Sequence, residues 1–263
     1  MTQPINHVVE LRDVSLAYPG KKVLDGVSLA VHPLDRLVIM GQSGSGKSTI
    51  LRLILGILQP SAGEIFFKQF EISRLSRTKL QQVRARIGMV YQYSALLSSR
   101  NVGDNVALPL EELTRKTTGE IDQLVDEKLA LVGMSDSKNL MPSELSGGMR
   151  KRVSLARALV MDPELILFDE PSAGLDPVIS SVIDELIISL TQHSKVTSII
   201  VTHEMDSAFR IGTRMAMLYH GKVIAQATPG EFKKIDHPVV QQFLSGSTKG
   251  PILEGTKDAV TTK

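Results

Sequence analysis

A glycine-rich segment stands between an apolar run and a helical pattern, and it constrains the fold of this chain more than any other feature. The apolar run covers residues 37–40 and the helical pattern covers residues 50–55. The segment between them fits G-x-x-x-x-G-K-[ST], a loop whose main-chain N–H groups and following helix N-terminus surround phosphate groups. This context predicts a nucleoside-triphosphate site in which Lys47 reaches the β- and γ-phosphates and Ser48 ligates Mg²⁺. The candidate binding residues are Gly41, Gln42, Ser43, Gly44, Ser45, Gly46, Lys47, Ser48 and Thr49.

Composition and charge narrow the classes of protein to which this chain can belong. Its 263 residues fit one large domain, or one domain with an insertion. The net charge of +2 comes from 30 basic and 28 acidic residues, which is too small to favour a nucleic-acid partner. We expect the short basic cluster Arg150, Lys151 and Arg152 to be a solvated face of a helix. The chain has no cysteine, so disulfides and thiol chemistry are excluded.

We expect no segment of the sequence to cross a membrane. No apolar run approaches the roughly 18–20 residues that a membrane-spanning helix needs. Residues 1–10 also lack the charged-then-apolar layout of a signal peptide. The expectation is therefore a cytoplasmic protein that contacts a membrane only through a partner.

The order of apolar patterns along the chain predicts an α/β fold. Residues 8–31 alternate in part between apolar and polar side chains, which indicates a β-rich start. After the loop come a helical insertion at residues 93–155 and a strand–helix–strand alternation at residues 165–201, which is typical of a mostly parallel sheet. A terminal hairpin follows at residues 215–225, and we expect the Gly- and Ser-rich tail at residues 245–263 to be flexible. Residues 1–244 are therefore expected to form one domain.

Four polar residues follow apolar strands and are candidates for hydrolytic chemistry. Asp169 is placed to hold Mg²⁺ opposite Ser48, and Glu170 comes one residue later, where a carboxylate can polarise an attacking water. Gln92 ends another apolar run, where its amide can contact the metal and the water. His203 follows a strand at the sheet edge where α/β proteins bind ligands, and it can contact the γ-phosphate. Each residue taken alone also fits a solvated strand end, but after a phosphate loop the hydrolytic interpretation is favoured.

A second glycine-rich helix start precedes the helical run at residues 150–160. Ser146, Gly147 and Gly148 lie at this N-terminus, which is again suited to binding an anion. One ATP hardly needs two such sites from the same chain. We therefore interpret the second site as one that contacts the ATP of another copy; a helix start with no ligand is the alternative.

Together these elements resemble, in order and spacing, the ATPase subunits of ABC transporters over about residues 8–230. The resemblance also places Tyr18 where that family stacks an aromatic ring on adenine, although an aromatic strand residue is more often in a core. The chain differs at Met149, where glutamine is usual; we expect activity to survive with altered nucleotide affinity. The matches are Walker A at residues 41–49, the Q-loop at Gln92, the signature motif at 145–149, Walker B at 167–170, the D-loop at 172–176 and the switch histidine at His203.

The resemblance implies a P-loop NTPase fold with a mostly parallel sheet core, an N-terminal antiparallel β subdomain and a helical subdomain at about residues 93–155. It implies ATP and Mg²⁺ as ligands, and Glu170 as the catalytic base. Two copies would pair head to tail around two ATPs. A groove near Gln92 would hold an integral membrane permease, which places the chain on the cytoplasmic face of a bacterial inner membrane.

Four segments are similar to the Mla-type, Mce-associated ATPases, which power phospholipid movement between the two membranes of Gram-negative bacteria. These segments are residues 92–97, 101–110, 171–177 and 242–251. The similarity implies a STAS-domain subunit and a periplasmic Mce lipid-binding protein as further partners. It also implies a C-terminal extension that reaches across to the other ATPase copy.

Three alternatives are weighed against this interpretation. One is the ATPase of another ABC system, for amino acids or lipoproteins, and another is a soluble ABC protein that acts on ribosomes or DNA. The last is a nucleotide-binding regulator without turnover, against which the presence of both Glu170 and His203 argues.

Overall fold

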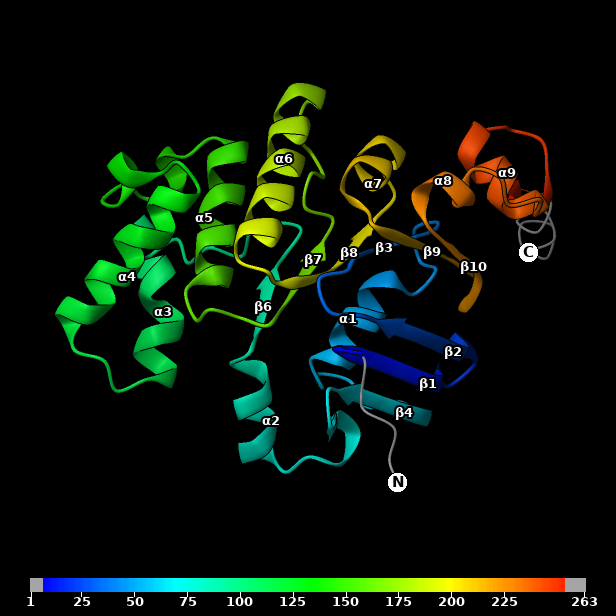
Figure 1. Cartoon of the computed structure of the whole chain (residues 1–263), viewed down its shortest axis with the longest axis horizontal. Helices are drawn as coiled ribbons and strands as arrows, with labels where there is room; N and C mark the ends of the chain where they lie inside the picture. Colours follow the sequence, from blue (N-terminus) through cyan, green and yellow to red (C-terminus); the bar gives the residue numbers. More distant parts are fainter. Residues whose placement is uncertain (1–6, 254–263) are drawn as a thin grey trace.

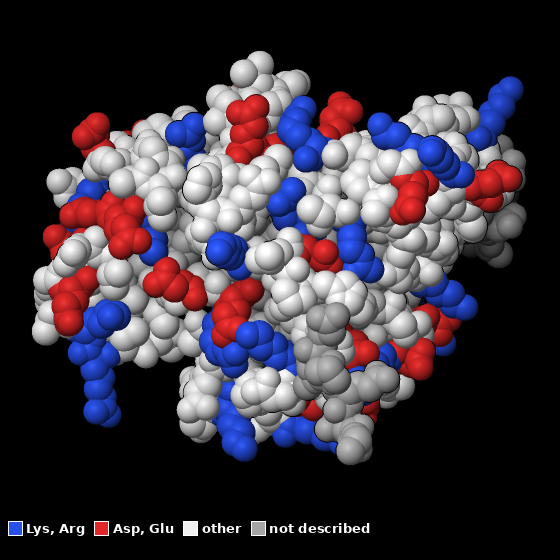
Figure 2. Space-filling view, in the orientation of Figure 1, with Lys and Arg blue, Asp and Glu red and all other residues white. Residues whose placement is uncertain are grey.

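The computed structural model of the chain describes residues 7–253, and its core is built around two separate sheets. In Figure 1 the N-terminal sheet lies beneath the larger sheet, and a group of helices projects to one side. Figure 2 shows that basic and acidic side chains are interspersed over the face in view. Across the described range, no helix has both the length and the apolar character that crossing a membrane requires.

The N-terminal sheet is antiparallel and has the strand order β2-β1-β4-β5. In its centre Leu11 lies opposite both Leu29 and Ile65, and all three side chains are buried. This confirms the predicted β-rich start. The sheet also contains a hairpin that the sequence did not predict, formed by two strands that follow the glycine-rich loop in the chain. The strands are β1 (Val9–Tyr18), β2 (Lys21–Val31), β4 (Ala62–Phe67) and β5 (Phe70–Glu71).

The larger sheet has six strands in the order β10-β9-β3-β8-β7-β6. All neighbouring pairs are parallel except the β9–β10 hairpin, which confirms the predicted α/β core and terminal hairpin. The carboxyl ends of β3, β7 and β8 therefore lie side by side at one edge. The strands are β3 (Arg36–Met40), β6 (Ile87–Val90), β7 (Leu165–Asp169), β8 (Thr197–Thr202), β9 (Arg214–Tyr219) and β10 (Lys222–Ala227).

Both faces of the larger sheet are buried, which is why its strands are nearly continuous apolar runs. In β3, Val38 and Met40 face one core cluster, whereas Leu37 and Ile39 face the other. One face is covered by α1 (Lys47–Ile54) and the N-terminal sheet, and the opposite face by helices that include α6 (Pro177–His193) and α7 (Met205–Ile211) (Figure 1).

The helical insertion lies between the end of β6 and the start of β7. Helix α4 ends at Leu131, two residues before Gly133, and a Thr117–Glu120 capping box fixes its start. Helix α5 ends at Leu159, close to the end of the helical run that the sequence predicted at residues 150–160, and its apolar face is part of the sheet's core. Its helices are α3 (Val102–Leu113), α4 (Thr118–Leu131) and α5 (Gly147–Leu159), and the separate helix α2 (Arg77–Arg84) precedes β6.

The end of the chain folds back on itself as far as Leu253. After α8 (Pro229–Phe232) and α9 (Pro238–Ser245), the Gln242 side chain donates to the carbonyl of Ser247 at 3.1 Å and accepts from the N–H of Ile252 at 2.8 Å. Ile252 is buried. Composition predicted a flexible segment from residue 245 on, whereas residues 246–253 are folded; residues 254–263 lie outside the described residues.

Candidate functional site

The predicted phosphate loop joins β3 to α1 and is shaped by glycines that no other residue can replace. Gly41 has φ 150°, and a Cβ added there would lie 2.2 Å from the carbonyl oxygen of Leu218. Gly46 has φ 107°, and its Cβ would lie 2.7 Å from Cδ2 of Leu24. The loop is therefore wedged between β2 and β9, which leaves the N-terminus of α1 open toward a ligand.

Lys47 begins α1 and folds back over the loop. Its Nζ donates to the carbonyl of Gly41 at 2.8 Å and to that of Gln42 at 3.0 Å. Burial lowers the pKa of Lys47, while the nearby Glu170 and Asp169 carboxylates act against that shift. A cation is thus held at the position where the predicted phosphates would lie.

Ser48 and Asp169 meet across the sheet edge. The Ser48 hydroxyl donates to Oδ1 of Asp169 at 2.8 Å, although 121 positions separate them in the chain. Hydroxyl and carboxylate oxygens are ligands that Mg²⁺ accepts, and this ion commonly takes only one or two protein ligands beside waters and phosphates. Within residues 7–253 no cluster of three or more His, Cys, Asp or Glu side chains could hold a metal by itself. The pair therefore fits a metal bound jointly with a nucleotide.

Glu170 and His203 come from the ends of the adjacent strands β7 and β8. Oε1 of Glu170 lies 2.9 Å from Nδ1 of His203, and the His203 main-chain N–H donates to Oε2 at 3.3 Å. Glu170 is only 8% exposed and has a left-handed backbone with φ 50°, held by its N–H bond to the carbonyl of Val201 at 2.9 Å. A non-glycine residue in this region is strained, and such strain is concentrated at functional sites.

One cavity of about 410 Å³ brings most of the predicted site residues together. Residues of the loop line it together with Gln92, Glu170 and His203. Sequence reasoning missed Lys21 and Val23, which also line it; only their place after the turn at residues 19–20 hinted at a loop near the site. The contributing loop residues are Ser43, Gly44, Gly46, Lys47, Ser48 and Thr49.

Tyr18 lies at the rim of the site and not in a core. Its side chain is 51% exposed, and it pairs across the β1–β2 hairpin with Lys21, which lines the cavity. An exposed ring at this position is free to stack on a flat ligand that extends from the cavity.

The second predicted anion site is not part of this cavity. Ser146 caps α5, and its hydroxyl accepts from the N–H of Met149 at 3.2 Å. Gly147 and Gly148 are packed closely by the segment that begins α6: a Cβ on Gly148 would lie 2.8 Å from Cγ2 of Ile179. None of Ser146, Gly147 and Gly148 lines the phosphate-loop cavity of the same chain.

The sequence suggested that the basic cluster at the start of α5 is a solvated face, but in the structure one of its three residues is buried. Lys151 is 6% exposed, and its Nζ donates to the carbonyl of Gln92 at 2.6 Å. Arg150 instead donates to the carbonyl of Leu145, just before α5, and Arg152 donates to the carbonyl of Val132, at the end of α4. The local sequence could not predict the burial of Lys151, because Gln92 is 59 positions away in the chain and comes close to Lys151 only in the folded protein.

Comparison with known proteins identifies the family to which the chain belongs. The family described as ABC transporter matches residues 24–173. The chain belongs to the ABC transporter family. It is the ATP-binding, ATP-hydrolysing subunit of such a transporter, and its fold is the ABC form of the P-loop NTPase fold.

Relatives of this ABC ATPase match it over nearly its whole length. The intermembrane phospholipid transport system ATP-binding protein MlaF of Escherichia coli (strain K12) is 40% identical over 252 residues, which cover 96% of this chain and 94% of MlaF. The probable ribonucleotide transport ATP-binding protein mkl of Mycobacterium tuberculosis (strain ATCC 25618 / H37Rv) is 38% identical over 259 residues, covering 98% of this chain and 72% of mkl.

Solved structures of ABC cassettes share the fold. The dimeric ATP-binding cassette MJ0796 in a post-hydrolysis state with ADP and Pi has a TM-score of 0.76 and 30% identity, covering 84% of this chain and 98% of the cassette. The cbiO1 protein of Clostridium perfringens, part of the transporter complex cbiONQ, has a TM-score of 0.80 and 31% identity, covering 86% and 90%.

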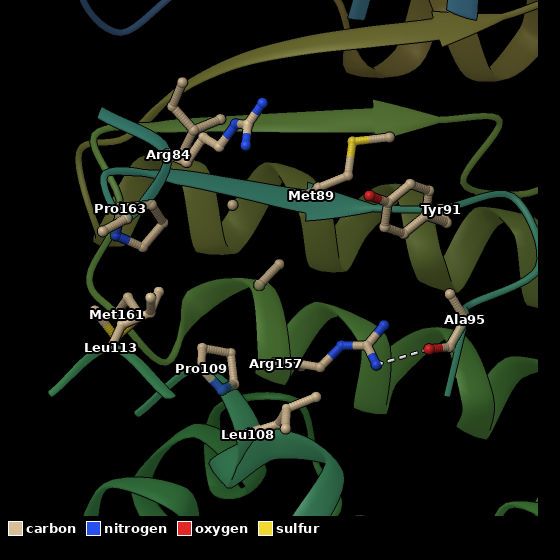
Figure 3. Close-up of a pocket in the computed structure, with 14 residues that line it drawn as sticks. Arg84, Met89, Tyr91, Ala95, Leu108, Pro109, Leu113, Arg157, Met161 and Pro163 are labelled. Carbon is tan, nitrogen blue, oxygen red and sulfur yellow. Dashed lines mark hydrogen bonds between the residues drawn. The ribbon is translucent and has the colours of Figure 1, made fainter. Parts of the chain in front are cut away.

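A second cavity of this ABC ATPase, about 300 Å³, runs along the edge strand β6. Figure 3 shows Met89 and Tyr91 on one side, Leu108 and Pro109 of α3 on the other, and Arg157 of α5 between them. Tyr91 is partly exposed, and burial lowers the pKa of Arg157. The groove is thus mainly apolar, with a basic group inside it.

Proposed function

We propose that ATP is held between two copies of this chain, so that the loop at residues 41–49 of one copy faces Ser146, Gly147 and Gly148 of the other. The observation that carries the proposal is the separation of the two anion sites: the cavity at the loop contains none of those three residues. A helix N-terminus that is suited to an anion and does not line the nucleotide cavity of its own chain is available to the nucleotide of a second chain.

In this proposal each residue of the loop cavity has one task. Main-chain N–H groups and Lys47 hold the phosphates, and Tyr18 stacks on the adenine. Ser48, Asp169 and Gln92 hold Mg²⁺ and its waters, and bound Mg²⁺ supplies neutralisation of phosphate charge. Support comes from the Ser48–Asp169 hydrogen bond of 2.8 Å and from Gln92, which lines the cavity.

Glu170 is the proposed catalytic base. Its carboxylate would accept a hydrogen bond from the attacking water and orient that water toward the γ-phosphate. His203 holds this carboxylate through its ring and its main-chain N–H, and once nucleotide is bound it would turn toward the γ-phosphate. The 52% exposure of the His203 side chain leaves it free to make that movement.

The groove beside β6 is the proposed docking site of the permease. The edge strand β6, apolar side chains of α3 and the half-buried Arg157 form a trough that suits one short amphipathic helix. Helix α5 connects this trough to Ser146 and its neighbours. The chain would then lie on the cytoplasmic face of a bacterial inner membrane, held there by the permease.

Phospholipid is the proposed cargo, moved between the inner and outer membranes. The support is the 40% identity to MlaF over nearly the full length of both proteins. A STAS-domain subunit and a periplasmic Mce protein would complete the complex, and a C-terminal extension would contact the partner ATPase. An ATPase of an amino-acid or lipoprotein system is the alternative.

Isolation of the intact complex tests this function. The tagged chain would be extracted from membranes in mild detergent, and its co-purifying proteins identified. We expect a multi-span permease with an Mce protein, and ATPase activity that rises on reconstitution into phospholipid vesicles. A permease of an amino-acid or lipoprotein system would favour the alternative, and purification with ribosomes or DNA would contradict transport.

A further inference from the structure

Lys151 connects three parts of the site that are far apart in the sequence. It lies in the second turn of α5, and its Nζ donates to the Gln92 carbonyl at 2.6 Å and to the Glu170 carbonyl at 3.3 Å. One ammonium group thus joins the helix that begins after Ser146, the segment that follows β6, and the main chain of the proposed catalytic base.

The environment of Lys151 is costly for a cation. Its side chain is 6% exposed, and both of its hydrogen-bond acceptors are main-chain carbonyls. Burial lowers the pKa of Lys151, and the Glu170, Glu204 and Asp169 carboxylates act from a distance against that shift. A buried ammonium without a paired carboxylate costs folding free energy, and an apolar side chain of similar volume is often the more stable choice. Stability alone therefore does not explain a lysine here.

The carbonyls that α5 holds belong to a strained region. Glu170 has φ 50°, and Ser94 and Ala95, just after Gln92, have φ 61° and 48°. Arg157, further along α5, donates to the Ser94 carbonyl at 2.7 Å and to the Ala95 carbonyl at 2.8 Å (Figure 3). Left-handed conformations of this kind persist only where their surroundings hold them. Cations of a single helix hold both segments.

We propose that Lys151 is a positioning residue for hydrolysis: it fixes the Gln92 and Glu170 main chains relative to α5. The inference rests on the proposed function, because α5 begins at the residues that would contact the partner's ATP. When that ATP draws the start of α5 toward it, Lys151 carries the displacement to both main chains. A misplacement of 1 Å in a site of this kind can cost about 10²-fold in rate.

The test substitutes Lys151 in the full chain and separates rate from affinity. K151M keeps most of the length of the side chain and removes its donors. We expect kcat to fall about tenfold or more, while the Kd for ATP of the single copy changes less than about twofold. Because the buried charge is removed, Tm should be unchanged or higher. K151R, which keeps a donating cation on a bulkier side chain, should lose less of kcat than K151M.

R152M is the matched control, since Arg152 is the next residue and, among the described residues, its side chain bonds only the Val132 carbonyl, at 3.4 Å. It should hydrolyse ATP as the unchanged chain does. Wild-type kcat in K151M would overturn the inference. So would a clearly lower Tm in K151M, because that result assigns Lys151 a structural role.

A second measurement keeps this inference distinct from the proposed function. K151M is combined with E170Q, and ATP-dependent pairing of the copies is measured by light scattering. We expect pairing to persist and the residual hydrolysis of E170Q to fall no further, because both changes affect one step. Loss of pairing in E170Q itself would contradict the proposed function; an additive loss of rate would contradict only the role of Lys151.

Discussion

The carboxylate of Glu170 lies 2.9 Å from Nδ1 of His203, at the ends of two neighbouring parallel strands. The register that pairs Asp169 with Val201 sets this distance, because it brings the residues after β7 and β8 to the same edge of the sheet. Residues of the chain itself thus fix the position of this carboxylate.

Replacement of Glu170 by Gln should nearly stop hydrolysis while ATP still binds. The amide keeps the shape of the side chain and its contact with His203, but it cannot accept a proton. Loss of a general base typically costs about 10²–10⁴-fold in rate. Phosphate release and nucleotide binding are the measurements, and full turnover in E170Q would remove Glu170 from its role.

Replacement of Lys47 by Ala should weaken ATP binding strongly. A buried lysine that donates to a phosphate contributes about 1.5–3 kcal/mol, or roughly 10- to 150-fold in Kd. Titration calorimetry measures this change. K22A is the control, because Lys22 is exposed and pairs with Asp25 outside the cavity. Equal affinities in K47A and the unchanged chain would argue against the whole phosphate site.

Replacement of Ser146 by Arg should impair hydrolysis without affecting ATP binding by one copy. The arginine would fill the space before α5 that the partner's ATP is proposed to occupy. Ser135, an exposed residue at another short helix, provides the control S135R. If S146R weakens ATP binding by the isolated copy, Ser146 belongs to the chain's own nucleotide site instead.

The buried Asp184 should make stability depend on pH. It is fully buried, and it accepts from Ser207 Oγ and Arg210 Nη1, each at 2.7 Å. Burial raises the pKa of Asp184, and this effect outweighs the lowering by the two hydrogen bonds. In the unfolded chain the value is about 3.9. The stability that Asp184 contributes is therefore fully present below that value and is lost as pH rises through the folded-state pKa.

The substitution D184N tests this sign. Asparagine cannot ionise, so the free energy of unfolding of the unchanged chain, minus that of D184N, should fall as pH rises from about 4 to 8. Urea denaturation at several pH values measures this difference. D206N, at an exposed carboxylate on α7, is the control. A difference that grows with pH would contradict the prediction.

Much of the site could be predicted from sequence because its residues are at the ends of apolar strands. The loop at residues 41–49, Glu170 and His203 each follow such a strand, and parallel strands bring their ends together. Lys151 could not be predicted in this way. Its position between two arginines predicts a solvated side chain, whereas its burial depends on contacts with Gln92 and Glu170, which are far away in the sequence.

The folded segment at residues 246–253 could not be predicted from the sequence for a related reason. Its Gly and Ser residues indicate flexibility, whereas two hydrogen bonds of Gln242 and the burial of Ile252 fix it against α9. The composition of a segment describes the average tendency of its residues, so it cannot predict a single specific contact such as these.

The central claim, that each ATP lies between two chains, is tested most directly by mixing two inactive variants. K47A destroys the loop half of every site, and S146R destroys the other half. In a mixed pair, one site receives both damaged halves and the other receives two intact ones. If pairing is random, activity should return to about a quarter of the unchanged rate, since half of the pairs are mixed and each has one intact site. A mixture no more active than its separate components would contradict the claim.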